Sequence, residues 1–125
     1  MKLSDFNVVH PPHETTTVLS DPLIHCFAGK QLVLVYVPRE ALMDYFQIPG
    51  DRRITLAQWN LVVDRNIEAL MLIIETKFER DEWGFHDAYK QSYPKIILTL
   101  SDLQQAANKL TIDVLDLDAG FRRHP

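Results

Sequence analysis

The sequence predicts an α+β fold, with a small, mainly antiparallel sheet packed by one long central helix and by shorter helices. Two observations predict it. The stretch from Thr55 to Trp83 has helical periodicity and contains no proline or glycine. Short runs rich in valine, isoleucine and leucine precede and follow it, and such runs are typical of strands. The length of 125 residues suits a single domain, which we place at residues 15–118.

The first part of the chain predicts extended structure. Residues 1–14 are expected to form an extended N-terminal leader, because Pro11 and Pro12 exclude a helix there. The β-branched run at 15–19 predicts a short strand. Residues 23–28 and 31–37 predict a hairpin around Gly29 and Lys30. After Gln31 the second arm is apolar on both faces, which indicates a central strand that needs cover on both sides.

Two helices should follow. Pro38 precedes a predicted two-turn helix at 39–46. The long helix begins with Thr55 and Gln58, which are spaced as a capping box, and it should end before Gly84. Seven apolar residues share one face of this helix, as a stripe toward the core should. They are Leu56, Trp59, Val63, Ile67, Leu70, Ile74 and Phe78.

A second apolar group lies on the back of the long helix. It consists of Leu61, Val62, Leu72 and Ile73. Two interpretations stay open: the group packs beneath the strand layer or the leader, or it contacts a second copy or a partner protein. An exposed apolar patch is costly and usually functional, so we treat these four residues as interaction candidates.

The last third of the chain alternates loop, strand and helix. Residues 84–95 are expected to form an aromatic, polar loop, and residues 96–100 a strand. Ser101 and Gln104 are spaced as a second capping box, which predicts a helix to about Leu110. Residues 111–117 fit either a last strand or a tail, and residues 119–125 should be a frayed C-terminal tail.

Composition restricts the function classes. The formal charge is −4 and the isoelectric point is near 5.6, which disfavours nonspecific binding to nucleic acids or to anionic membranes. Cys26 is the single cysteine, so no intrachain disulfide forms. The N-terminus lacks the apolar run of a signal peptide, and no stretch reaches the length of a membrane span. We expect a cytoplasmic protein with no membrane contact.

Three short tracts resemble a known bacterial family. They are Val33–Phe46, with the sequence VLVYVPREALMDYF; Asp64–Arg80, with DRNIEALMLIIETKFER; and Ile96–Leu103, with IILTLSDL. Together they resemble the proteins of domain of unknown function 1488 over about residues 32–103. The order of strand, short helix, long helix, strand and short helix is similar too. Two departures are a longer N-terminal region, residues 1–22, and a longer loop at residues 83–95. The family carries no assigned catalysis, so the resemblance supports the fold alone.

Metal and nucleophile patterns are weak. His10 and His13 have H-x-x-H spacing and His25 precedes Cys26, but the two intervening prolines exclude the helix that would align the histidines on zinc. Cys26 lies in an apolar predicted strand, which indicates a buried, inert thiol. Asp113, Asp116 and Asp118 do not fit the ligand spacing of an EF-hand. We expect no metal and no cofactor.

Acidic and basic residues also favour structural roles. Glu68, Glu75 and Glu79 on the long helix would need a cleft to act as acid–base catalysts, and a solvated stripe is the preferred interpretation. Arg65–Glu68 and Lys77–Asp81 have the spacing of weak intrahelical ion pairs. The basic residues considered for phosphate contact are few and dispersed. They are Lys30, Arg52, Arg53, Arg122 and Arg123.

The aromatic segment after the long helix is the preferred surface candidate. It contributes Trp83, Phe85, Tyr89 and Tyr93, and tryptophan and tyrosine are enriched at binding hot spots. The preferred interpretation of Trp83 and Phe85 themselves is that they fold back onto the helix end as a satellite core, and a partner or small-ligand surface is the other interpretation. We identify no catalytic residue, and our preferred function is a noncatalytic protein–protein interaction or regulatory module that self-associates. A small enzyme or ligand binder that uses residues 83–93, and a nucleic-acid-associated protein, are the alternatives.

Overall fold

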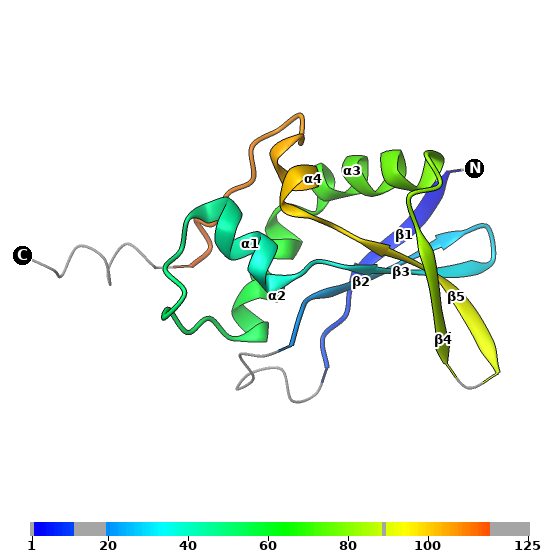
Figure 1. Ribbon diagram of the computed structural model, residues 1–125, viewed down its shortest axis with the longest axis horizontal. Coiled ribbons are helices and arrows are strands. Elements are labelled where there is room, and N and C mark those ends of the chain that lie inside the picture. The colour runs from blue at the N-terminus through cyan, green and yellow to red at the C-terminus, as the bar shows by residue number, and fades with distance from the viewer. Residues whose placement is uncertain (1, 12–19, 89, 116–125) are drawn as a thin grey trace, which may run out of the picture.

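A five-stranded mixed sheet forms one side of the molecule, and helices lie on one face and at one end of it (Figure 1). The computed structural model describes residues 2–11, 20–88 and 90–115. The strands are β1 (Leu3–Val8), β2 (Leu23–Ala28), β3 (Gln31–Tyr36), β4 (Gly84–Ala88) and β5 (Gln91–Ile97), in the order β1-β2-β3-β5-β4. The helices are α1 (Arg39–Phe46), α2 (Leu56–Arg65), α3 (Ile67–Glu79) and α4 (Leu100–Gln104). The predicted α+β class is confirmed.

The predicted β2–β3 hairpin is confirmed, with Gly29 at φ 63° in its turn, a conformation that glycine adopts without steric cost. The prediction of a mainly antiparallel sheet holds in part. The pairs β1–β2, β2–β3 and β4–β5 are antiparallel, whereas β3 and β5 are parallel. The chain leaves β3 through three helices and returns as the β4–β5 hairpin. The second strand of that hairpin then runs beside β3 in the same direction.

Strand β1 lies within the segment that we expected to be a leader. Its extended conformation agrees with the expectation, but its pairing with β2 makes it part of the sheet. Asp5 has a φ of 55°, and the pairing register shifts between Ser4 and Asn7, so this edge strand contains a bulge. The strand predicted at 15–19 and the tail at 119–125 lie outside the described residues.

The prediction of a single long helix is wrong in one respect. The helix is interrupted at Asn66, which separates α2 from α3, and the chain changes direction there (Figure 1). Asn66 has φ −108° and ψ 16°, and its side chain bonds to the backbone of Thr111. The expected capping box of Thr55 and Gln58 is present. Helix α3 ends at Glu79, before Gly84, because Asp81 takes a left-handed conformation with φ 57°.

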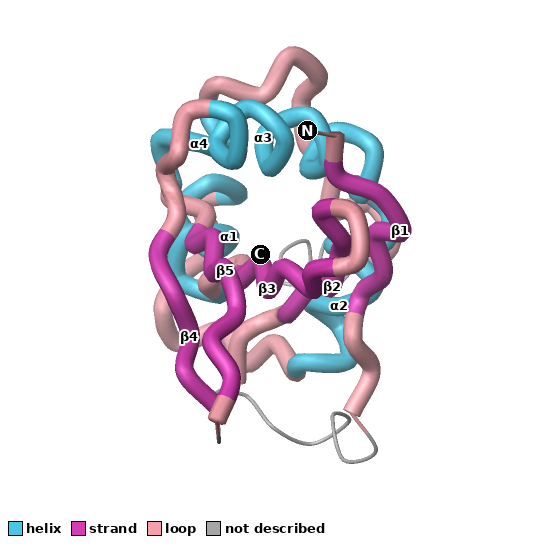
Figure 2. The backbone as a smooth tube through the Cα atoms, turned by 90° about the vertical axis from the view of Figure 1, so that its right-hand side faces the viewer, coloured by secondary structure: helices cyan, strands magenta, loops and turns pink. Residues whose placement is uncertain are grey.

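The predicted core stripe of the two helices is confirmed. Its members Leu56, Trp59, Val63, Leu70 and Ile74 are buried, while Ile67 and Phe78 are partly buried against the core. Figure 2 shows α3 and α4 on one side of the sheet, across from β3. The inward-facing side chains of the central strands pack between the sheet and the helices. These are Ile24, Cys26, Val33, Val35 and Ile96.

The expected loop at 84–95 is a β-hairpin instead. Residues 84–88 form β4 and residues 91–97 form β5, so the polar and aromatic residues of this segment lie in strands. The last helix is also shorter than predicted. Thr99 caps it, in a capping box with Asp102, and it ends at Gln104 instead of near Leu110. Residues 111–115 form no strand, although Ile112 and Leu115 contact the core.

Candidate functional site

The sheet face opposite α3 carries apolar and aromatic side chains. Side chains alternate between the two faces of a strand, so the strand register assigns each residue to a face. Tyr36 pairs with Leu23 on one side and with Ile97 on the other, and Leu34 pairs with Lys95. We call this surface the open face. We define it by ten residues of β2 to β5, and the polar residues Ser4, Asn7 and Gln91 share the same face at its margins. The ten residues are Leu23, His25, Phe27, Leu32, Leu34, Tyr36, His86, Tyr93, Lys95 and Ile97.

Within the described part of the chain, no helix covers the open face. Helix α3 contacts β1 and β5 from the other side, and the views in Figures 1 and 2 place α3 and α4 on that side as well. Leu34 is shielded by its neighbours, and most other members are half-buried. Ile97 is 46% exposed. The sequence indicated this surface only through β3, whose two apolar faces predicted cover on both sides.

The open face is poor in charge. Lys95 is its one fixed charge, and no Asp or Glu belongs to it. The rings of Tyr36 and His86 lie 6.4 Å apart, and burial lowers the pKa of His25. A surface of leucine, isoleucine and aromatic residues with so little charge has the composition of the buried centre of a protein–protein contact.

The predicted interaction patch on the long helix is divided by the structure. Val62 is 1% exposed and belongs to the core, so its assignment to an interface is wrong. Ile73 is half-buried against the core. Leu61 and Leu72 are 51% and 56% exposed. They lie on different helices, since the break at Asn66 separates them, and they do not form the continuous back stripe that we expected.

The aromatic candidates after α3 form a stack on the helix side of the β4–β5 hairpin. Trp83 stacks on Phe78 of α3 with ring centroids 5.6 Å apart, and Phe85 meets the edge of Trp83 at 5.3 Å. Trp83 therefore folds back onto the helix end, as the preferred interpretation of the sequence predicted. Phe85 remains 61% exposed. Tyr93 belongs to the open face, and Tyr89 lies outside the described residues.

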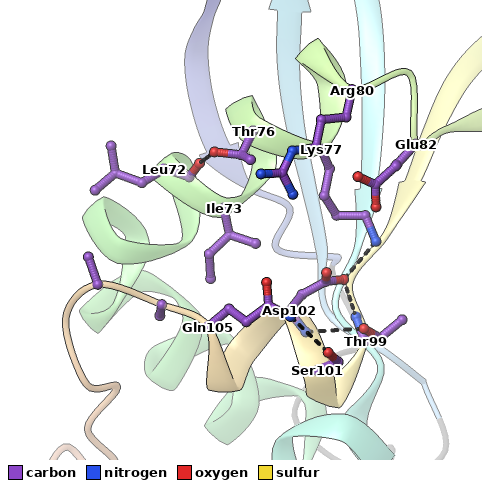
Figure 3. Close-up of a pocket in the computed structure, with 12 residues that line it drawn as sticks. Leu72, Ile73, Thr76, Lys77, Arg80, Glu82, Thr99, Ser101, Asp102 and Gln105 are labelled. Atoms are coloured by element: carbon purple, nitrogen blue, oxygen red, sulfur yellow. Dashed lines mark hydrogen bonds and ion pairs between the residues drawn. The ribbon is translucent and has the colours of Figure 1, made fainter.

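A groove of about 560 Å³ separates α3 from α4 and the loop that follows α4 (Figure 3). Leu72, Ile73, Ala106 and Ala107 line its apolar part. Its polar lining is contributed by Thr76, Lys77, Arg80, Glu82, Thr99, Ser101, Asp102 and Gln105. Residues 83–93, Glu75 and Glu79 are not among the lining residues, so the groove is separate from the loop that we considered for a ligand binder.

A close ion pair forms the floor of the groove. Lys77 Nζ donates to Asp102 Oδ2 at 2.6 Å and to the Ile97 carbonyl at 3.0 Å, and both side chains are largely buried. Burial by itself would raise the pKa of Asp102, but hydrogen bonds from Lys77 and Thr99 hold that pKa below its usual value. These groups satisfy one another, which indicates that the pair fastens α3 to β5 and α4.

The ion pairs that the sequence suggested are replaced by longer-range ones. Lys77 binds Asp102 in place of Asp81, and Arg65 binds Asp113 at 3.3 Å in place of Glu68. The hydrogen bond from Arg65 lowers the pKa of the exposed Asp113. Thr99 and Asp102 have the spacing of a capping box, which is the sequence signal for the position of Asp102 at the start of α4. We expected that motif at Ser101 and Gln104 instead.

The candidate metal and nucleophile residues that the structure describes are dispersed, and His13, Asp116 and Asp118 lie outside the described residues. His10 pairs with Asp64 at 3.2 Å, and His25 and Cys26 point to opposite faces of β2. Residues 2–11, 20–88 and 90–115 contain no group of three His, Cys, Asp or Glu residues that could hold a metal. Cys26 is buried, and burial together with the nearby charge of Glu75 raises its pKa to about 12. Such a thiol is a poor nucleophile.

The basic candidates do not converge either. Lys30 lies in the β2–β3 turn, whereas Arg52 and Arg53 lie in the segment between α1 and α2. Figure 1 places this turn and this segment at opposite ends of the molecule. Arg122 and Arg123 lie outside the described residues. The expectation of dispersed basic residues therefore holds for the three that the structure describes.

Comparison of the chain with protein-family models, with curated proteins and with solved structures gives no match. The resemblance to domain of unknown function 1488 therefore stays a prediction. In the described part of the chain, no helix combines the length and apolar character needed to cross a bilayer.

Proposed function

We propose that this protein is a noncatalytic interaction module that self-associates through the open face of its sheet. The observation that carries the proposal is the apolar second face of β3, where Leu34 and Tyr36 lie between Leu23, Lys95 and Ile97. A sheet buries such a face by packing on another layer. A second copy of the chain presents an equivalent apolar face.

Sheet-on-sheet packing suits the chemistry of this surface. Two sheets pack with their side chains interdigitated at a separation of about 10 Å. In a two-fold contact the leucine and isoleucine side chains of both copies leave water, while Lys95, beside Leu34, buries its aliphatic part and extends its ammonium group toward the edge of the contact. The absence of Asp and Glu from the ten residues of the open face avoids burying carboxylates in the contact.

The size of the face predicts modest affinity. Strand spacing of about 4.8 Å and a rise of about 3.3 Å per residue give β2, β3, β5 and β4 a flat footprint of roughly 400 Å². A standard protein–protein interface buries roughly 800 Å² per partner. We therefore expect reversible association that depends on protein concentration, and this fits a regulatory or assembly role better than a permanent oligomer.

Sedimentation equilibrium tests the proposal. The wild-type protein should show reversible, concentration-dependent self-association, and Ile97→Glu should weaken that association, because the variant places a carboxylate in the apolar contact. Leu61→Glu is the matched control: Leu61 is at least as exposed as Ile97 but lies on α2. It should leave the equilibrium unchanged. Circular dichroism establishes that both variants are folded.

Two outcomes would contradict the proposal. The first is a wild-type protein that sediments as a monomer at every concentration. The second is a dimer that survives Ile97→Glu and is lost with Leu61→Glu, which would move the contact to the helical surface. The ligand-binding alternative at residues 83–93 has less support, because none of the described residues in that range lines the groove between α3 and α4.

A further inference from the structure

The two edges of the sheet differ in how they are protected. Edge strands expose unpaired backbone groups, and proteins commonly block them with bulges. β1 contains the bulge at Asp5, which breaks its regular spacing. β4 pairs with β5 without a register shift from Gly84 to Ala88. In Figures 1 and 2, no described segment runs along the outer side of β4.

The register identifies which backbone groups of β4 point outward. Leu98 N–H donates to the Tyr36 carbonyl of β3 at 3.0 Å. Backbone direction alternates along a strand, so Pro94 also faces β3, while Tyr93 and Lys95 face β4. Their partners in β4 are His86 and Gly84. Phe85 and Asp87, opposite Pro94 and Ser92, therefore direct their N–H and C=O groups to the free edge.

Phe85 combines this outward backbone with an exposed apolar side chain. Its ring is 61% exposed and rests on Trp83 on the helix side of the sheet. If two β4 strands pair antiparallel around a two-fold axis at Phe85, the two phenyl rings lie side by side and shield each other. An axis at His86 would instead place the exposed Phe85 ring of each copy opposite the carboxylate of Asp87. An axis at Phe85 leaves Asp87 opposite Trp83, which precedes β4 and is already packed on Phe78.

We infer that two copies of this chain join edge to edge through β4, with Phe85 at the two-fold axis. This contact goes beyond the proposed function, because it uses the edge of the sheet and leaves the open face free. The Phe85 N–H of each copy donates to the Phe85 carbonyl of the other, and the two sheets become one continuous sheet. The open faces of both copies then lie on the same side of it.

Disulfide trapping tests this arrangement. In a Cys26→Ala background, Phe85→Cys places a single thiol at the axis. The Cα atoms of a hydrogen-bonded antiparallel pair are roughly 5.5 Å apart, within the range that a disulfide spans. Leu72→Cys, at a similarly exposed position on α3, is the matched control. In a glutathione redox buffer we expect covalent dimer from Phe85→Cys and none from Leu72→Cys.

A proline variant tests the backbone pairing itself. Asp87→Pro removes an outward N–H and leaves the bonds between β4 and β5 intact, whereas Asp87→Asn keeps that N–H. Adding Asp87→Pro to the Phe85→Cys protein should abolish trapping, and adding Asp87→Asn should preserve it. Circular dichroism confirms folding. Trapping that is equal for the two cysteine positions, or that survives Asp87→Pro in a folded protein, would overturn the inference.

The same assay separates this inference from the proposed function. Ile97→Glu disrupts the open face and leaves the outward groups of β4 in place. Phe85→Cys should therefore still trap a dimer when Ile97→Glu is present. If Phe85→Cys traps a dimer but Ile97→Glu does not change self-association in sedimentation, the edge contact is supported and the open-face contact is rejected. If Ile97→Glu weakens self-association but Phe85→Cys traps no dimer, the open-face contact is supported and the edge contact is rejected.

Discussion

Asn66 and Thr111 exchange two hydrogen bonds across 45 positions of sequence. Thr111 N–H donates to Asn66 Oδ1 at 2.8 Å, and Asn66 Nδ2 donates to the Thr111 carbonyl at 2.7 Å. The same Nδ2 donates to the Val62 carbonyl at 2.7 Å. One buried amide thus fastens the C-terminal segment to the point where α2 ends and α3 begins.

Replacing this amide should destabilise the fold. Asn66→Ala removes three hydrogen bonds and leaves the Thr111 backbone groups without their side-chain partner, so we expect the free energy of unfolding to fall by about 2–3 kcal/mol. Urea denaturation measures it. Asn108→Ala, at an exposed position, is the control and should change stability by less than about 0.5 kcal/mol. Equal effects from both variants would show that the amide is not a structural contact.

Neighbouring residues of α2 should differ in their response to truncation. Val62→Ala removes buried methyl groups from the core and should cost about 1–2 kcal/mol of unfolding free energy. Leu61→Ala removes a larger side chain from the surface and should change it by less than about 0.5 kcal/mol. Thermal and urea unfolding compare the two. A larger loss from Leu61→Ala would mean that Leu61 is covered in solution.

The Lys77–Asp102 pair should make stability depend on pH. The folded-state pKa of Asp102 lies below its ordinary value, so the unfolded chain binds a proton first as the pH falls. The contribution is therefore complete above about pH 5, declines as the pH falls through the ordinary aspartate pKa of about 3.9, and is absent below the folded-state pKa.

Urea midpoints measured across that pH range test this dependence. Asp102→Asn should flatten the decline, because the variant has no carboxyl group to protonate there. Asp51→Asn, at an exposed position between α1 and α2, is the matched control and should keep the wild-type slope. An unchanged slope in Asp102→Asn would assign the acid sensitivity to other carboxylates.

The thiol of Cys26 should be unreactive in the folded protein. Burial and the charge of Glu75 raise its pKa to about 12, so almost no thiolate is present at neutral pH. Ellman's reagent should label Cys26 only when urea unfolds the chain, with the labelling midpoint at the unfolding midpoint. Rapid labelling of the native protein would show that the sheet opens locally at β2.

Several local features follow directly from the sequence. The β2–β3 hairpin, helix α1, the Thr55–Gln58 capping box and the core stripe of the long helical region were predicted and are confirmed. Each depends on residues within a few positions of one another. Periodicity and capping chemistry report such local relationships well.

The candidate surfaces were predicted less well. Residues 31–37 indicated a strand with two apolar faces, but the neighbours that complete the open face come from β2, β4 and β5. Val62 was assigned to a surface because an unbroken helix places it on the back. The turn at Asn66 changes the direction of the chain, and Val62 then lies in the core.

The amino-acid sequence by itself determined the α+β class and the apolar stripe that faces the core. It also contains no recognisable reactive motif. Tertiary structure decided the parallel pairing of β3 with β5, the interruption at Asn66, the Lys77–Asp102 pair and the residues that share the open face. The physical reason is that side-chain spacing encodes local conformation. Partners such as Asn66 and Thr111 become neighbours only when the whole chain has folded.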